Sequence, residues 1–384
     1  MEIPEIFVLL LLANTTVYGF LILAFTIGLI KIHLVTQLQS PQQSGFISVI
    51  VAVRNESKNI FRILEELRNQ DFPRDRIEVI ITDDYSEDDT MSVARSFASG
   101  NPGFSLVLLS SELTENCETG KKSALAKAIA VAKGDILLFT DADTGRSSSW
   151  ITSMVSGFES PKVQMILGPV YFCGEKNLLQ KIQSFEFLGL MGVTAGSAAL
   201  GYPVMCNGAN LAYRKSAFLQ AGGFDRNLKY ASGDDQFMMS SVRNQHGKGA
   251  VIFNADPLAA VSTEAEATLS GFLHQRMRWV SKSRGYRDPV VITVGVITWL
   301  THFLLLAGII SGFFFPEVLA VSLLLWLAKI VLEYPMVMIM GRFFRMERIS
   351  GCYFIAQIFQ VIYVPLTGLA GLFIPYRWKG RRGL

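Results

Sequence analysis

The sequence is poor in charged residues and in cysteine. Asp, Glu, Lys and Arg together make up 17% of its 384 residues, below the quarter that is usual in globular domains. The four cysteines lack the spacing of metal ligands and fit reduced thiols in a cytoplasmic compartment. The net charge of +3 is small, and no basic–aromatic interleaving is present, so we expect contact with membrane lipids and no nucleic-acid partner.

Hydrophobic residues make up half of the chain and are concentrated in long runs. Residues 6–30 are almost wholly apolar, which is long enough to cross a bilayer as a helix. A cleaved signal peptide needs a basic N-terminal region and a shorter apolar core, whereas this N-terminus carries Glu2 and Glu5. We therefore expect residues 1–33 to form a retained transmembrane anchor, followed by a linker over residues 34–45.

Three further apolar runs predict C-terminal membrane helices within residues 288–375. The runs cover residues 290–315, 318–340 and 353–374. Lys31 lies just beyond the apolar run of residues 6–30, so the positive-inside rule places the following domain in the cytoplasm, at the inner membrane. The loop before the last run and the tail, residues 376–384, are both basic and both expected to be cytoplasmic, which conflicts with three single crossings. We favour a re-entrant or interfacial path for the last run, which its Pro and Gly residues permit.

Residues 46–287 alternate short apolar runs with helical stretches. Strands are expected at residues 46–53, 77–82, 105–109 and 136–140, and helices at residues 58–69, 90–98 and 121–132. Strands that alternate with helices are typical of a mostly parallel sheet, so the predicted fold class is α/β. Ligands bind such sheets at the carboxyl ends of the strands, where Asp83, Asp84, Asp141 and Asp143 all fall.

Paired carboxylates at the end of a buried strand are costly, because like charges repel unless a cation or another partner lies between them. Asp141 and Asp143 are two residues apart, and on an extended segment their side chains point the same way. They are suited to a hard divalent cation, Mg²⁺ or Mn²⁺, with the phosphates of a nucleotide completing its shell. The spacing is common by chance, so its meaning depends on the neighbouring motifs.

The segments after the first two strands offer polar groups to a nucleotide. Arg54, Asn55 and Glu56 either lead into the next helix or contact the nucleoside. Asp83 and Asp84 either belong to a solvated loop that caps a helix or accept a hydrogen bond from a base. The calcium-binding EF-hand is excluded, because the loop lacks the glycine and the glutamate that this motif requires.

Lys121 follows Gly120 at the expected start of a helix. A phosphate-binding P-loop is excluded, because Glu115 stands where that motif needs glycine. Lys121 is either solvated or contacts a diphosphate beside the helix N-terminus.

Two later motifs suit an acceptor and a leaving group. Asp234 and Asp235 either cap the following helix or provide a general base for an acceptor hydroxyl. Gln275, Arg278 and Trp279 share one helix face. That face either belongs to an amphipathic interfacial helix or provides an arginine for a departing diphosphate and a tryptophan ring for a sugar.

Taken in this order, the motifs resemble those of the membrane-integrated family 2 glycosyltransferases, which include cellulose, chitin and hyaluronan synthases and ceramide glucosyltransferase. The resemblance covers residues 46–287 and is supported by Gly208-x-Asn210-x-Ala212-x-Arg214 and by Gly222-Gly223-Phe224-Asp225. It implies a GT-A fold with a nucleotide-binding half and an acceptor half, flanked by transmembrane helices. Ala52-Val53 departs from the usual Pro-containing turn, and Asp234 stands where Glu is commoner.

The resemblance also implies roles for individual residues. Asp84, with Asp83, matches the nucleotide-contacting aspartate; Asp141 and Asp143 match the metal motif; Asp235, after Asp234, matches the catalytic base; Gln275, Arg278 and Trp279 match the acceptor and diphosphate motif. Together they imply an inverting, metal-dependent transfer of a sugar from a nucleotide sugar, expected to be UDP-linked.

The acceptor and the competing functions follow from the membrane segments. About four segments are few for a polymer pore, so a lipid or lipid-linked acceptor is favoured over a processive polysaccharide synthase, although the Gln-x-x-Arg-Trp motif is prominent in processive relatives. A membrane transporter or nucleotide-sensing receptor is disfavoured, because the apolar runs carry few ionisable residues beyond His302, Lys329 and Glu333. We interpret His302 and Lys329 as lying near helix ends or in helix contacts.

Overall fold

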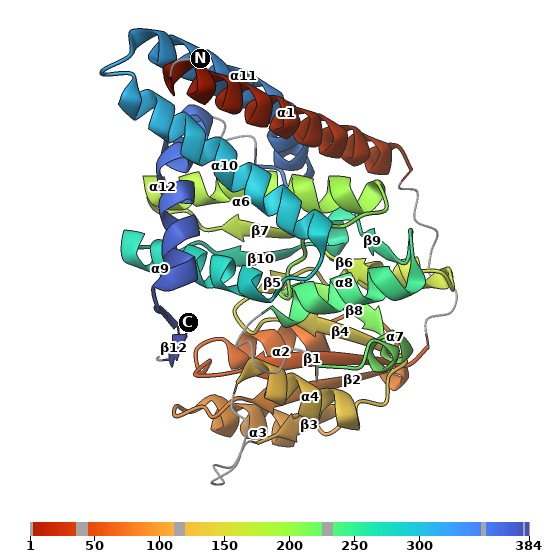
Figure 1. Cartoon of the computed structure of the whole chain (residues 1–384). Helices are drawn as coiled ribbons and strands as arrows, with labels where there is room; N and C mark the ends of the chain where they lie inside the picture. Colours follow the sequence, from red (N-terminus) through yellow and green to blue (C-terminus); the bar gives the residue numbers. More distant parts are fainter. Residues whose placement is uncertain are drawn as a thin grey trace. The chain divides into compact units, whose positions relative to one another are not determined.

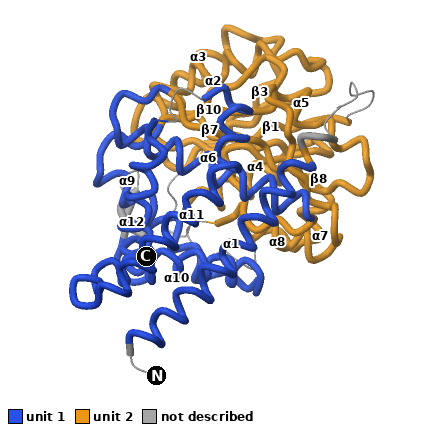
Figure 2. Tube along the Cα trace, turned by 90° about the horizontal axis from the view of Figure 1, so that it is seen from above, with its two compact units in different colours: residues 1–31, 174–200, 265–384 blue, residues 32–173, 201–264 orange. Residues whose placement is uncertain are grey.

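A computed structural model describes residues 3–35, 45–110, 120–224, 233–346, 351–378 and 381–383. The contacts within the chain divide it into two units (Figure 2). Unit 1 comprises residues 1–31, 174–200 and 265–384, and unit 2 comprises residues 32–173 and 201–264. Cys117, Asp225 and most of the expected linker, residues 36–44, lie outside the described residues.

Unit 2 is built on a seven-stranded sheet with the strand order β3-β2-β1-β4-β8-β6-β9 (Figure 1). The strands are β1 Ile47–Val53, β2 Ile77–Asp83, β3 Leu106–Leu109, β4 Ile136–Thr140, β6 Met165–Leu167, β8 Asn210–Arg214 and β9 Val251–Phe253. The first four are parallel to one another, and β8 runs antiparallel to both β4 and β6. The predicted mostly parallel sheet is confirmed, and each of the four expected strands is present to within one residue.

The helices of unit 2 form where apolar residues recur at helical spacing. They are α2 Ile60–Arg68, α3 Thr90–Gly100, α4 Lys121–Val131, α5 Trp150–Ser156, α7 Lys215–Gln220 and α8 Asp234–His246. In α2, for example, Ile60, Ile63, Leu64 and Leu67 are buried and lie on one face, as the 3.6-residue period requires. A small second sheet joins β5 Gly145–Arg146, β10 Val261–Glu264 and β7 Val170–Cys173.

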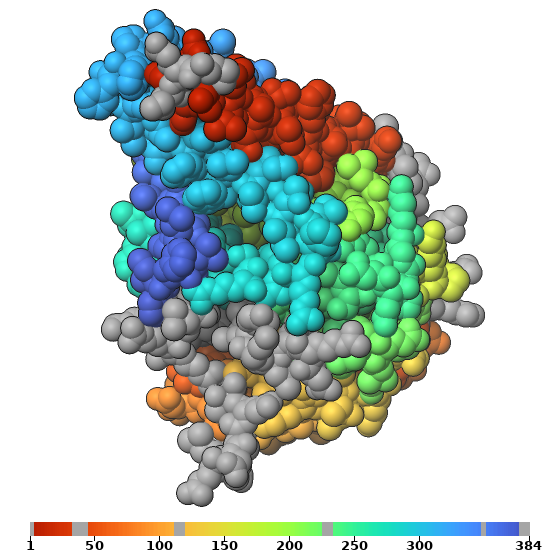
Figure 3. All heavy atoms as spheres, viewed as in Figure 1, coloured from red at the N-terminus to blue at the C-terminus, as the bar shows by residue number. Residues whose placement is uncertain are grey.

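Unit 1 is mainly helical. Its elements are α1 Ile3–Val35, which extends a few residues beyond the unit, α6 Leu178–Ala199, α9 Leu269–Ser281, α10 Pro289–Ser311, α11 Pro316–Phe343, α12 Tyr353–Phe373, β11 Tyr376–Trp378 and β12 Arg381–Gly383. In the described part of the chain, four helices are long and apolar enough to cross a membrane: Pro4–Ile32, α10, α11 and α12. Figure 3 shows α1 packed beside α10 and α11, where Asn14 donates to Thr301 over 2.7 Å. Large apolar side chains such as Phe20, Leu324 and Val331 are more than 60% exposed, as lipid-facing residues would be.

The last apolar run forms one continuous helix, although Pro365, Gly368 and Gly371 lie within it. The glycines allow close packing rather than a break. A Cβ at Gly368 would lie 2.2 Å from the Trp299 ring of α10, and one at Gly371 would lie 2.7 Å from Val280 of α9. The path of α12 relative to a membrane stays a prediction.

Polar side chains form a buried cluster among the apolar helices of unit 1. Lys329, near the middle of α11, is fully buried and forms a 2.9 Å ion pair with Glu333. The ammonium also donates to Gln357 and Gln360 of α12, over 2.7 and 3.2 Å, and Tyr18 of α1 donates to Glu333. Lys329 therefore lies in a helix contact and not near a helix end. Buried charges persist only when they are paired and hydrogen-bonded, so this cluster joins three helices.

Replacing Lys329 with Met is expected to destabilise unit 1 by roughly 3–5 kcal/mol, because it leaves the Glu333 carboxylate buried without its counter-charge. Thermal unfolding of the purified chain in detergent micelles measures the change. Glu317→Gln, at an exposed position of the same helix, is the matched control and is expected to unfold like the wild type. Unfolding of Lys329→Met at the wild-type temperature would show that the pair does not stabilise the helices.

Candidate active site

The loops after β1 and β2 interlock at the carboxyl edge of the sheet in unit 2. Asn55 has a positive φ of 53°, and its side-chain oxygen accepts from the backbone N–H of Glu87 over 2.8 Å. Arg54 donates to the Asp84 carbonyl over 2.8 Å, and the backbone N–H of Glu56 donates to Thr90 over 2.8 Å. The expected Arg54-Asn55-Glu56 turn therefore lies against the loop that carries the first acidic pair.

Asp83 ends β2 and Asp84 follows it, and both are buried. The Asp83 carboxylate accepts from the Ser86 backbone N–H at 3.2 Å, which closes its own loop. The Asp84 carboxylate accepts from the Gly120 backbone N–H at 2.9 Å, next to the start of α4. Asp84 therefore connects the end of β2 to the residue that precedes Lys121.

Lys121 and Asp141 form an ion pair, with Nζ 2.6 Å from Oδ1. Burial opposes the charge on Lys121, but the nearby carboxylates of Asp141, Asp234 and Asp235 outweigh it and raise the pKa of Lys121 above its usual value. Lys121 is therefore a permanently charged group among three carboxylates. Asp141 contacts Lys121 directly, and Asp84 accepts a hydrogen bond from Gly120, the residue before it.

The Asp141–Asp143 segment differs from the prediction in its local geometry. The chain leaves β4 at Thr140 and turns at residues 142–143, so the two carboxylates do not lie on an extended segment. The turn forms because the Thr144 hydroxyl donates to the Asp141 carbonyl over 2.7 Å. Asp141 is partly exposed and Asp143 is exposed.

Arg146, which the sequence did not single out, supports this turn. Its Nη2 donates to both the carbonyl and the hydroxyl of Thr144, each over 2.8 Å. The side chain is fully buried, and burial lowers the pKa of Arg146 to about 10, although Glu66, 3.1 Å away, favours the charged form. The sequence did not indicate a role for an arginine five residues after Asp141. The contact between Arg146 and Thr144 depends on how the chain turns after β4.

Asp234 and Asp235 begin α8. Gly233, whose φ of 94° is readily adopted only by glycine, precedes them. The Asp235 carboxylate is buried and accepts from the backbone N–H groups of Gly208 and Gln236, over 3.0 and 2.8 Å. These two bonds fix its orientation at the N-terminus of a helix, where negative charge is favoured.

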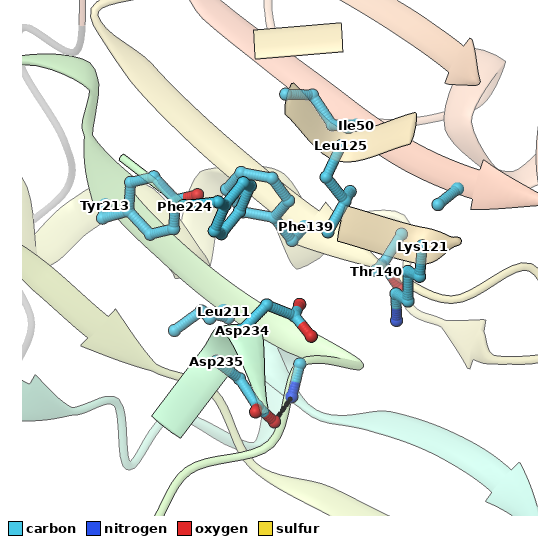
Figure 4. A pocket seen from close by; sticks show the side chains of 12 residues that line it. Ile50, Lys121, Leu125, Phe139, Thr140, Leu211, Tyr213, Phe224, Asp234 and Asp235 are labelled. Carbon is cyan, nitrogen blue, oxygen red and sulfur yellow. Dashed lines mark hydrogen bonds between the residues drawn. The ribbon is translucent and has the colours of Figure 1, made fainter. Parts of the chain in front are cut away.

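A pocket of unit 2 joins these groups (Figure 4). The polar lining includes Lys121, Thr140, Asp234 and Asp235, and the apolar lining includes Ile50, Leu125, Phe139, Leu211, Tyr213 and Phe224. Its open space, including solvent at the mouth, is about 360 Å³. Figure 4 shows the Lys121 ammonium and the Asp234 carboxylate on the same pocket, with Asp235 held by Gly208. The structure therefore brings the first, second and third acidic motifs into one part of unit 2.

Gln275, Arg278 and Trp279 lie on α9 in unit 1, and we describe them within that unit. All three are partly exposed, whereas the neighbouring Phe272, Arg276 and Met277 are buried. The predicted helix and its shared face are observed. The sequence did not single out Arg276, although a cation on the buried side of an amphipathic helix requires a partner.

The carboxylates of unit 2 suit a divalent cation. Carboxylate oxygens are ligands that Mg²⁺ and Mn²⁺ prefer, and Asp141 already holds a cationic group, the Lys121 ammonium. Within the described residues, no three His, Cys, Asp or Glu side chains gather as a ready-made metal site. A cation at Asp141 and Asp143 would therefore need oxygens from a ligand such as a diphosphate.

Comparison with known proteins places this geometry among glycosyltransferases. A family model described as Glycosyl transferase family 21 matches residues 16–381. Glycosyltransferase AglE of Haloferax volcanii is 30% identical over 127 residues, which is 33% of this chain and 40% of the relative. An N-acetylglucosaminyltransferase of Bradyrhizobium diazoefficiens is 26% identical over 297 residues, 75% of this chain and 58% of the relative. The chain spans about half the length of the curated relatives it matches.

A solved structure covers nearly the whole chain. The mannosyltransferase PcManGT from Pyrobaculum calidifontis, in complex with GDP-Man and Mn²⁺, has a TM-score of 0.61 and 18% sequence identity. The match covers 96% of this chain and 99% of that one. At this identity the likeness concerns the fold, and it confirms the expected GT-A class of α/β sheet with flanking helices.

Proposed function

The chain belongs to glycosyl transferase family 21, and from this membership we propose that it moves a sugar from a nucleotide sugar to a lipid or lipid-linked acceptor. This membership confirms the glycosyltransferase that the motifs predicted. The resemblance pointed to family 2, whereas the matching family model is that of family 21. One observation carries the proposal: Asp84, Lys121, Asp141 and Asp235 are linked through a few contacts at one edge of the sheet in unit 2.

We propose that the nucleotide binds where the loops after β1 and β2 meet. Arg54, Asn55 and Glu56 would shape one wall, and the buried carboxylates of Asp83 and Asp84 would accept hydrogen bonds from a base. A carboxylate can accept a hydrogen bond from the N3–H of uracil, so the site is compatible with the proposed UDP-linked donor. Lys121 would contact the diphosphate, because its charge is kept by three surrounding carboxylates.

Asp141 and Asp143 would hold a divalent cation against that diphosphate. When bound, such a cation supplies positive charge that stabilises the leaving diphosphate. The turn that Thr144 and Arg146 support would keep the two carboxylates at the end of β4. Lys121 would exchange its contact with Asp141 for one with the phosphates as the donor binds.

Asp235 would take the proton from the acceptor hydroxyl. Its two backbone hydrogen bonds fix the carboxylate, and Asp234 lines the same pocket. The acceptor oxygen would then form its bond to C1 of the sugar as the bond from C1 to the diphosphate breaks. Attack from the face opposite the leaving group inverts C1, and no covalent intermediate with the protein is required. Arg278 would add charge for the diphosphate, and Gln275 and Trp279 would bind the acceptor.

The charges on the membrane helices support the proposed orientation of the chain in the membrane. Glu5 and Glu317 lie near the starts of α1 and α11, and Lys31 and Arg342 lie near their ends. The two helices run in the same direction, because Phe7 and Ser322 both lie at Gly308, and Tyr18 contacts Glu333. The basic residues thus gather at one end, which the positive-inside rule places in the cytoplasm. A processive polysaccharide synthase is the second candidate, favoured by the Gln-x-x-Arg-Trp motif on α9 and by the 28% identity over 235 residues to a poly-β-1,6-N-acetyl-D-glucosamine synthase of Staphylococcus aureus.

A screen of nucleotide sugars tests the proposed function. The full chain in nanodiscs of native lipid is mixed with UDP-, GDP- and other nucleotide-linked sugars in the presence of Mg²⁺ or Mn²⁺, and release of the nucleoside diphosphate is measured. We expect release from one donor class, raised by added lipid extract. No release above a protein-free control from any donor would contradict the proposal and would favour a transporter or receptor.

Replacing Lys121 with Met is expected to weaken UDP binding by about 10–100-fold, because a hydrogen bond to a charged group contributes about 1.5–3 kcal/mol. Isothermal titration of UDP in the presence of Mn²⁺ measures the change. Lys127→Met, at an exposed position of the same helix, removes the same charge outside the site and serves as the control. Equal UDP affinity of both variants would exclude the diphosphate role of Lys121.

A further inference from the structure

Arg276 lies at the centre of a buried network in unit 1. Its side chain meets Glu186 of α6 in a two-pronged contact, with Nη2–Oε2 at 2.6 Å and Nε–Oε1 at 3.2 Å. Both side chains are at most 8% exposed. Tyr363 of α12 donates to the same carboxylate, so α6, α9 and α12 meet at one point. Figure 1 shows α12 passing beside α9, where Phe272 packs edge-on against Tyr363.

The same guanidinium contacts two of the three motif residues on α9. Its plane lies over the Trp279 ring, 4.1 Å from the centroid, and Nη1 donates to the Gln275 side-chain oxygen over 2.5 Å. The Phe272 ring lies on it as well, at 4.6 Å. The guanidinium thus contacts both rings and makes directed bonds along its edges. A lysine ammonium could neutralise Glu186 but could not provide this combination of flat face and fixed donors.

We infer that Arg276 is a positioning residue that sets the orientation of Gln275 and Trp279, braced by Glu186 and Tyr363. The part of the inference that concerns acceptor binding rests on the proposed function. If Arg276 served only to pair with Glu186, its contacts would be limited to that carboxylate. Here the arginine also contacts two partly exposed side chains, Gln275 and Trp279, which lie next to the buried side of α9. Because Tyr363 belongs to an apolar helix, the acceptor-facing side chains are fixed from the membrane helices.

The orientation itself can be measured without any activity. The full chain, labelled with 5-fluorotryptophan in nanodiscs, gives one ¹⁹F signal for each of its five tryptophans, and Trp279→Phe assigns the signal of Trp279. In Arg276→Lys we expect the Trp279 signal to shift and broaden while those of Trp150 and Trp326 keep their positions. Arg243→Lys, which alters another buried arginine that lies 4.0 Å from a ring, is the matched control and should leave Trp279 unchanged. A Trp279 signal at its wild-type position in Arg276→Lys would overturn the inference.

Kinetics separate positioning from a general loss of structure. Transfer of labelled sugar to a total lipid extract is compared with release of the nucleoside diphosphate when no acceptor is added. For Arg276→Lys we expect transfer to fall about 10–100-fold, since a misplacement of about 1 Å has this effect, with release within about twofold of wild type. Tyr363→Phe, which removes one hydroxyl and keeps the ring, is expected to show the same selective loss to a smaller extent.

The two sets of outcomes distinguish the inference from the proposed function. Equal losses of transfer and release in both variants, or unchanged transfer in both, would overturn the acceptor-positioning role of Arg276. A shifted Trp279 signal in a protein that releases no diphosphate from any donor would uphold the positioning of Trp279 and contradict sugar transfer.

Discussion

Asp235→Asn is expected to lower sugar transfer by about 10²–10⁴-fold, the usual effect of removing a general base. The change keeps the shape of the side chain, and its remaining carbonyl oxygen can still accept from the Gly208 backbone N–H. Donor binding should therefore change little, because the hydrogen bond between Asp84 and Gly120 and the ion pair between Lys121 and Asp141 do not involve Asp235. Initial rates with labelled donor, together with calorimetric titration of UDP, measure the two effects separately.

Two further variants make this result specific. Asp89→Asn changes an exposed carboxylate at the start of α3, so it alters a helix N-terminus in the same way without touching the site, and it should transfer sugar normally. Asp234→Asn is expected to lower transfer less than Asp235→Asn, because Asp234 is more exposed, whereas the backbone N–H groups of Gly208 and Gln236 fix the buried Asp235 carboxylate. Wild-type transfer by Asp235→Asn would remove the base assignment.

Asp143→Ala is expected to weaken Mn²⁺-dependent UDP binding by about 10–100-fold, since even side chains that only support a metal ligand have effects of this size. Asp143 is exposed at the turn after β4, so its loss should leave the fold of unit 2 intact. Titration of UDP with and without Mn²⁺ gives the metal-dependent part of the affinity.

The control for Asp143→Ala removes the same charge elsewhere in unit 2. Asp75 lies at an exposed position before β2, at the opposite end of that strand from Asp83, so Asp75→Ala should bind UDP like the wild type. If the Mn²⁺-dependent affinity of Asp143→Ala equals that of Asp75→Ala, then Asp143 is not part of a metal site.

Local patterns predicted the framework of unit 2 because they act over short distances. The apolar spacing in residues 58–69 depends on the helical period alone, and the resulting α2 buries the face that this spacing marks. The ends of β1, β2 and β4 followed from β-branched and apolar runs, which also located Asp83, Asp84 and Asp141 at the edge of the sheet. Four apolar runs likewise gave four helices long enough to cross a membrane.

Contacts between distant segments were beyond the reach of those patterns. Glu186 and Arg276 are 90 residues apart, and nothing in either neighbourhood specifies the other. The sequence also did not indicate where residues 174–200 pack. We expected them within the domain of residues 46–287, but they belong to unit 1 with the membrane helices. A glutamate in the apolar stretch of α6 could have indicated a buried partner, but not which one, and we did not single it out from the sequence.

The candidate site shows the same division. Spacing in the sequence suggested that Asp141 and Asp143 project together from an extended strand, yet the Thr144 hydroxyl turns the chain at that point. The sequence left Lys121 either solvated or in contact with a diphosphate, and its contact with Asp141 depends on the packing of α4 on the sheet. Motif identity was therefore readable from the chain, whereas the partners of each motif residue required the fold.

Incorporation of sugar into lipid tests sugar transfer most directly. The purified full chain in native-lipid nanodiscs is given nucleotide sugars labelled in the sugar, and the organic extract is examined for labelled product and for its number of added sugars. We predict a lipid-soluble product bearing a single added sugar from one donor class, absent with Asp235→Asn. If no donor labels the lipid fraction above the Asp235→Asn background, sugar transfer to a lipid by this chain is contradicted.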